Sequence, residues 1–118
     1  MNQNVILPII AAIGGEEFNK VGTVKPYLFT PNVLGFLKSP AYGVRIEVGI
    51  KKAIMLIIYD EGADLYIVYA GKNCKNVGKK YDGIYYDRLL TIIELEADQK
   101  FPNLKCPEFE IEIKDFEI

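Results

Sequence analysis

The chain has 118 residues, of which half are hydrophobic and a quarter are charged; its formal net charge is −2 and it contains no histidine. This length and composition predict one globular domain, residues 1–118, and exclude disordered, collagen-like and disulfide-dense proteins. The missing histidine excludes serine–histidine catalytic triads, histidine general bases and histidine-containing metal sites.

The first 43 residues give the weakest pattern. The apolar run of residues 5–13 fits either a strand or a short helix that starts near Pro8, and two glycines follow it. Pro26 and Pro31 oppose a helix on both sides of residues 24–29, so this segment is expected to be extended. We therefore predict strands and loops for this third of the chain.

Three consecutive strands are predicted in the middle of the chain. Residues 44–51 alternate between apolar and polar side chains, which is the period of a half-buried strand. Residues 53–59 are apolar throughout, as expected of a central strand covered on both faces. A turn at residues 60–64 precedes residues 65–70, which are rich in aromatic and β-branched side chains. The simplest arrangement is an antiparallel meander.

A loop and a helix are predicted next. Residues 71–83 contain three glycines and no apolar period, which is typical of a long loop. Helical spacing gathers the apolar residues of segment 85–98 on one face, with Asp82 available as the N-terminal cap. Glu96 is the exception, because it falls within the apolar face near the last turn. A strand over residues 91–97 is the alternative.

Strict alternation marks the C-terminal segment. Acidic and apolar residues alternate there: Glu108, Phe109, Glu110, Ile111, Glu112 and Ile113. On a strand, this spacing places the three carboxylates on one face over a length of about 13 Å. Phe116 and Ile118 follow out of phase, which indicates a bulge or the end of pairing.

The acidic face of this segment predicts a docking surface for a basic protein, with Phe116 or Ile118 as an apolar anchor. The charge of the chain is uneven in the same sense: residues 1–81 carry ten basic and six acidic side chains, whereas residues 82–118 carry four and ten. Such a bias marks a binding surface in some proteins; the alternative is that the two halves of the chain interleave in the fold, so that their charges average out. The alternative is a solvated outer face whose charges discourage pairing at the edge of a sheet.

A second candidate surface combines lysines and tyrosines that are close in sequence. Its members are Lys72, Lys75, Lys79, Lys80, Tyr81, Tyr85 and Tyr86. Lysines neutralise phosphates and tyrosines stack on bases, while glycines let backbone amides approach an anion. However, no phosphate-loop motif matches, and the chain has only two arginines. The alternative is a set of solvated lysines that serve solubility.

Neither a metal nor another cofactor is expected. The acidic set Asp60, Glu61 and Asp64 does not have the spacing of a calcium-binding loop and fits a solvated hairpin turn. Cys74 lies between lysines, but no histidine is available as its base. With two cysteines and no glycosylation acceptor, the chain is expected to be cytoplasmic. The apolar run near the N-terminus lacks a preceding positive charge, so a signal peptide is not expected.

These patterns predict an α+β fold, in which a mainly antiparallel sheet of four to six strands packs one amphipathic helix on one face. A mostly β sandwich or barrel is the alternative. The first functional expectation is a non-enzymatic protein-binding module, such as an inhibitor, an immunity-type protein or an antitoxin. The alternative is a binder of phosphate or single-stranded nucleic acid, and no membrane partner is expected. An enzyme would need a site of Asp, Glu, Lys, Tyr or Cys side chains, and no spacing nominates a set.

Overall fold

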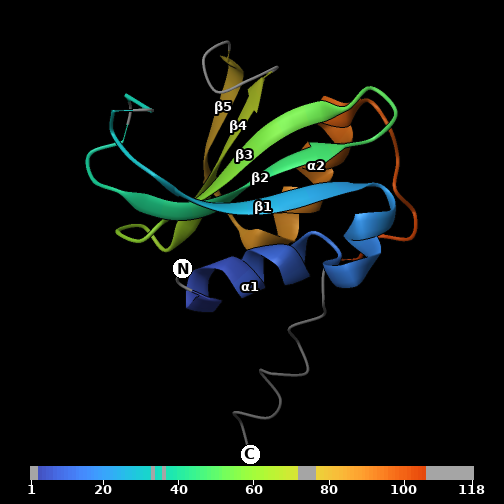
Figure 1. Cartoon of the computed structure of the whole chain (residues 1–118), viewed down its shortest axis with the longest axis horizontal. Helices are drawn as coiled ribbons and strands as arrows, with labels where there is room; N and C mark the ends of the chain where they lie inside the picture. The colour runs from blue at the N-terminus through green and yellow to red at the C-terminus, as the bar shows by residue number, and fades with distance from the viewer. Residues whose placement is uncertain (1–2, 33, 36, 72–76, 106–118) are drawn as a thin grey trace, which may run out of the picture.

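The computed structural model describes residues 3–32, 34–35, 37–71 and 77–105 of the chain. Within these ranges the elements, in chain order, are α1 (Gln3–Ala12), the 3-10 helix η1 (Gly15–Lys20), β1 (Gly22–Phe29), β2 (Ala41–Val48), β3 (Ala53–Asp60), β4 (Leu65–Gly71), β5 (Val77–Ile84), the 3-10 helix η2 (Tyr86–Arg88) and α2 (Leu89–Ala97). The strands form one sheet, and α1 and α2 pack on the same face of it (Figure 1).

Each strand pairs with the next one in antiparallel direction, in the spatial order β1-β2-β3-β4-β5. Short turns at residues 49–52 and 61–64 join β2 to β3 and β3 to β4. The sheet is open, with β1 and β5 as the edges of its described part. The predicted α+β fold and the predicted meander are therefore confirmed, whereas the barrel alternative is wrong.

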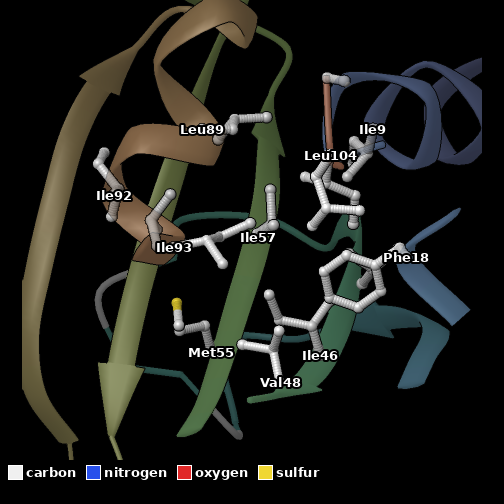
Figure 2. Close-up of a cluster of buried hydrophobic side chains, with 14 of the residues drawn as sticks. Ile9, Phe18, Ile46, Val48, Met55, Ile57, Leu89, Ile92, Ile93 and Leu104 are labelled. Carbon is white, nitrogen blue, oxygen red and sulfur yellow. The ribbon is translucent and has the colours of Figure 1, made fainter. Parts of the chain in front are cut away.

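The helix-covered face of the sheet holds the main hydrophobic core. Ile46 on β2 lies opposite Met55 on β3, and both are fully buried. The helical segments contribute apolar side chains to the same cluster: Ile6, Ile9, Ile13, Phe18, Leu89, Ile92 and Ile93. Figure 2 shows many of these side chains converging on β2 and β3. Because burial of one aliphatic side chain contributes about 1.5–3 kcal/mol, this layer is the main source of stability.

The second face of the sheet, opposite the helices, carries a smaller apolar cluster. Its buried members are Phe29, Leu34, Leu56, Ile58 and Ile67. Leu34 comes from the connection between β1 and β2, so this connection covers part of the second face. β3 is consequently buried on both faces, through Met55 and Ile57 on one side and Leu56 and Ile58 on the other. The prediction of a doubly covered central strand is confirmed.

The prediction of strands and loops for the first third of the chain is wrong at its N-terminal end, where α1 forms. Ile6, Ile9 and Ile13 are buried at helical spacing against the sheet, which stabilises the helix through packing. Pro8 lies inside α1, but Pro8 and Asn4 are both exposed. The hydrogen bond that Pro8 cannot donate is therefore lost on the solvent side. The extended segment expected at residues 24–29 is confirmed as part of β1.

The long loop predicted for residues 71–83 is also wrong over its whole described part, because Gly71 ends β4 and residues 77–84 form β5. The pairing of β5 with β4 contains register shifts, and Gly83 has a φ of 64°. These irregularities interrupt the alternation from which a strand is predicted. Asp82 consequently lies in β5 and does not cap a helix, whereas the helix itself is confirmed as η2 followed by α2.

Candidate functional site

The described lysines and tyrosines of the second candidate surface lie on both faces of the sheet and do not form one surface. Alternation along β5 places Tyr81 on the helix-covered face, where it packs against the main core. Lys80 takes the opposite parity and lies next to Asp82, with Nζ and Oδ1 3.4 Å apart. Tyr85 is 63% exposed, while Tyr86 packs against the core. Lys72 and Lys75 lie outside the described residues.

Tyr81 and Lys79 converge on Glu96 of α2, the acidic residue in the apolar face of the helix. The Tyr81 hydroxyl donates a short hydrogen bond to Glu96 Oε2, and Lys79 Nζ lies 3.7 Å from the same oxygen. The hydrogen bond, followed by burial and the charge of Glu96, raises the pKa of Tyr81 to about 12. Glu96 therefore joins α2 to β5, and Lys79 and Tyr81 are engaged in this contact.

The acidic set lies where the sequence predicts a turn: Asp60 is the last residue of β3, and Glu61 and Asp64 belong to the turn between β3 and β4. The Tyr59 hydroxyl donates a hydrogen bond of 2.6 Å to Asp64 Oδ1, and the Tyr59 and Tyr66 rings pack with their centres 5.6 Å apart. The hydrogen bond to Asp64, together with burial, raises the pKa of Tyr59 to about 12. Asp64 is thus a structural partner in the turn. Among the described residues, no group of three or more Cys, Asp or Glu side chains is placed to hold a metal ion.

A row of side chains that crosses the second face was not predicted from the sequence. The register aligns one residue from each strand, namely Lys25, Arg45, Leu56, Tyr69 and Lys80. Arg45 lies between Val44 and Ile46, which point to the helices, so its side chain lies on the second face. The polar positions of each alternating strand were visible in the sequence, but the register that lines them up was not. The row therefore places three cations and one aromatic ring on one surface.

Like charges meet at the β1 end of this row. Lys25 lies directly opposite Arg45 in the register. Arg45 Nη2 has Glu47 Oε2 at 4.0 Å, whereas Lys25 makes no ion pair with any of the residues that the structure describes. Like charges directly opposite each other in a sheet are destabilising. This end of the row is consequently suited to receive a carboxylate.

The outward edge of β1 has a defined set of backbone groups. The Val21 carbonyl accepts a hydrogen bond of 3.0 Å from the Gly49 amide, so residue 21 faces β2. Backbone groups alternate along a strand, which turns the amides of Gly22, Val24 and Leu28 outward. Pro26 has the same outward parity, as expected for a residue without an N–H group in an edge strand. Five of the eight residues of β1 are exposed.

A cleft of about 530 Å³ lies at one end of the sheet. Leu37 and Pro40 of the connection before β2, Ile58 of β3, and Lys80 and Asp82 of β5 all line it. Its apolar floor belongs to the second cluster, and its two charged side chains from β5 neutralise each other as an ion pair.

The residues predicted to dock a basic protein lie outside the described part of the chain: Glu108, Glu110, Glu112, Phe116 and Ile118. The segment that leads to them is firmly placed. Phe101 and Leu104 are 3% and 5% exposed, and the Phe101 amide donates to Glu94 Oε2 over 2.8 Å. Leu104 packs so closely on Gly14 that a Cβ there would lie 2.8 Å from Leu104 Cδ2. The acidic segment therefore starts beside a fixed anchor.

No helix of the described ranges is long and apolar enough to span a bilayer. Comparison of the chain with protein-family models, with curated proteins and with solved structures finds no match.

Proposed function

We propose that the chain is a non-enzymatic, cytoplasmic protein-binding module, of the inhibitor, immunity-type or antitoxin kind. Its acidic C-terminal segment, residues 106–118, docks on a basic surface of the partner protein. The partner is recognised through Glu108, Glu110 and Glu112, and the apolar side chain of Phe116 or Ile118 anchors the contact.

The observation that supports this proposal best is the segregation of charge. The described residues contain 11 basic and 11 acidic side chains, so the body that they form is neutral. Residues 106–118 contain five acidic side chains and one lysine. A concentrated negative charge steers diffusional encounter with a basic surface and discriminates against acidic proteins.

The anchor at Leu104 supports the same proposal. Because Leu104 is buried and Lys105 is exposed, the acidic segment leaves the body at a fixed point on the surface. The body acts as a scaffold that presents the segment.

The test compares charge reversals in two places. Affinity capture from native extract, with and without nuclease, isolates a stoichiometric protein complex, whose dissociation constant is then measured by titration. Glu108→Lys, Glu110→Lys and Glu112→Lys together weaken the complex at least about tenfold, because each introduced lysine then repels the basic partner. The control variant Glu16→Lys, Glu61→Lys and Asp87→Lys changes the net charge equally on exposed positions of the body and leaves the affinity unchanged. Equal affinities of both triple variants would overturn the proposal.

The alternative, binding of phosphate or single-stranded nucleic acid, has less support because Lys79 and Tyr81 contact Glu96. It predicts that nuclease abolishes capture. It also predicts an affinity that falls by about one log unit per log unit of salt for each phosphate contacted. A complex that survives nuclease and contains only protein excludes it.

A further inference from the structure

We propose that the outward edge of β1 receives residues 108–113 of the same chain as a sixth strand. These residues lie outside the described part of the chain, and the edge that would hold them lies inside it. Three properties of the edge fit the alternating segment: its backbone groups, the charge on one face and the apolar surface on the other. The inference is independent of the proposed partner.

The backbone of β1 can accept a further strand. The outward amides of Gly22, Val24 and Leu28 and the intervening carbonyls face away from β2, and only Pro26 lacks a donor. The opposite edge is less suitable, because the register of β5 against β4 shifts at two places. A regular strand pairs better with the regular register of β1, which runs without a shift from Gly22 to Phe29.

Charge fits on the second face. Lys25 faces Arg45 across the β1–β2 pair and has no ion pair with the described residues. An added strand whose glutamates point to the second face would place carboxylates beside Lys25. Because Glu108, Glu110 and Glu112 share one parity, all three take this side together. Opposite charges on neighbouring strands stabilise a sheet, and they relieve the repulsion between Lys25 and Arg45.

Apolar surface fits on the helix-covered face. With the glutamates on the second face, Phe109, Ile111 and Ile113 necessarily point to the side of the helices. There they meet β1 positions that the fold leaves open: Leu28 is 48% exposed and Pro26 is exposed as well. The reversed parity would place carboxylates against Leu28 and isoleucines beside Lys25. The first parity therefore pairs the carboxylates with Lys25 and the apolar side chains with Leu28.

The last described residues before the acidic segment lie close to the start of β1. Leu104 and Val21, the residue before β1, line the same small cleft. Two residues, 106 and 107, lie between Lys105 and Glu108, and an extended chain spans about 3.3–3.6 Å per residue. From this starting point the segment runs parallel to β1, towards Phe29. Because the segment is tethered next to the edge, its effective concentration is in the millimolar range, which favours pairing within one chain over pairing between two.

Amide hydrogen exchange, followed residue by residue with NMR on the full chain, tests the sixth strand. The Val24 and Leu28 amides should exchange at least about tenfold more slowly than in the variant Ile111→Pro, since a proline inside the segment breaks its pairing. Glu117→Pro, outside the paired residues, leaves their exchange unchanged. The Lys25 and Tyr27 amides face β2 and stay protected in every variant, which shows that the sheet is intact.

Two outcomes would overturn the inference. One is equal exchange of the Val24 and Leu28 amides in the natural chain and in Ile111→Pro. The other is protection of these amides that grows with protein concentration together with a dimer in sedimentation, which would make a second copy the occupant. Failure of either kind leaves the proposed partner untouched, because the exchange is measured on the free protein. If both proposals hold, the partner and β1 compete for one segment.

Discussion

β3 and β1 belong to one sheet but differ in every respect that determines burial. None of the eight residues of β3 is exposed, whereas five of the eight residues of β1 are. β3 packs against the helices on one face and against the β1–β2 connection on the other. β1 has one neighbouring strand, a proline in its outward ladder and a lysine without an ion pair among the described residues. The centre of this sheet is therefore covered on both faces, whereas its β1 edge is largely exposed in the described part of the chain.

Truncation of a core residue gives the largest difference between the two strands. Ile57→Ala removes a fully buried side chain from the centre of the core (Figure 2) and is expected to lower the free energy of unfolding by about 2–5 kcal/mol. Leu28→Ala on β1 removes a half-exposed side chain and costs less. Urea denaturation of both variants measures the difference. A cost of Leu28→Ala equal to that of Ile57→Ala would show that the β1 edge is as well covered as the centre.

Addition of one methyl group on β2, which lies between β1 and β3, tests how closely its neighbours on these two strands pack against it. A Cβ on Gly43 of β2 would overlap the Ile57 carbonyl oxygen and lie 3.0 Å from the Phe29 ring. Gly43→Ala is therefore expected to destabilise the fold by about 1–3 kcal/mol. The control is Gly62→Ala in the exposed β3–β4 turn, where the nearest atom would lie 3.7 Å away. If Gly43→Ala left the melting temperature unchanged, the Phe29 ring and β3 would have to shift away from residue 43 at no cost in stability.

At the opposite edge of the sheet, the hydrogen bond from Tyr81 to Glu96 joins β5 to α2. Tyr81→Phe is expected to lower the free energy of unfolding by about 1 kcal/mol. The folded-state pKa of Tyr81 is about 12, above its ordinary value of 10.0. The contribution is therefore complete below pH 10 and disappears as the pH rises from 10 to 12.

Unfolding measured between pH 7 and pH 11 checks this dependence, and Tyr85→Phe, at an exposed position, is the control. A difference between the natural chain and Tyr81→Phe that does not shrink above pH 10 would contradict the assignment. Spectroscopic titration of the tyrosines gives a second readout, because Tyr81 should ionise later than an exposed tyrosine.

Local sequence patterns predicted the elements whose burial follows from their own residues. The apolar run of β3 indicates burial on both faces, and the helical period of α2 indicates burial on one face, so both elements were predicted. In contrast, β5 pairs with β4 through an irregular register and is joined to α2 by the contacts of Tyr81 and Lys79 with Glu96, which lie 15 or more positions apart and which no local period contains. The misplaced Glu96 was the one visible signal, since a carboxylate in an apolar helix face requires a partner. The row from Lys25 to Lys80 depends on the register of five strands and was likewise out of reach.

The smallest effect is also the one whose sign decides how the β1 edge is used. Lys25→Gln removes one of two opposed cations, so an edge without a sixth strand gains a few tenths of a kcal/mol in the free energy of unfolding. An edge that holds the acidic segment loses its nearest cation instead, and Lys25→Gln then destabilises the chain by a similar amount. We expect destabilisation at low salt that vanishes near 1 M salt, because screening removes interactions between exposed charges. Lys38→Gln, at an exposed position in the β1–β2 connection, controls for the change in net charge. Stabilisation by Lys25→Gln at low salt would contradict the docking of residues 108–113, since only an edge without carboxylates nearby benefits from the loss of this lysine.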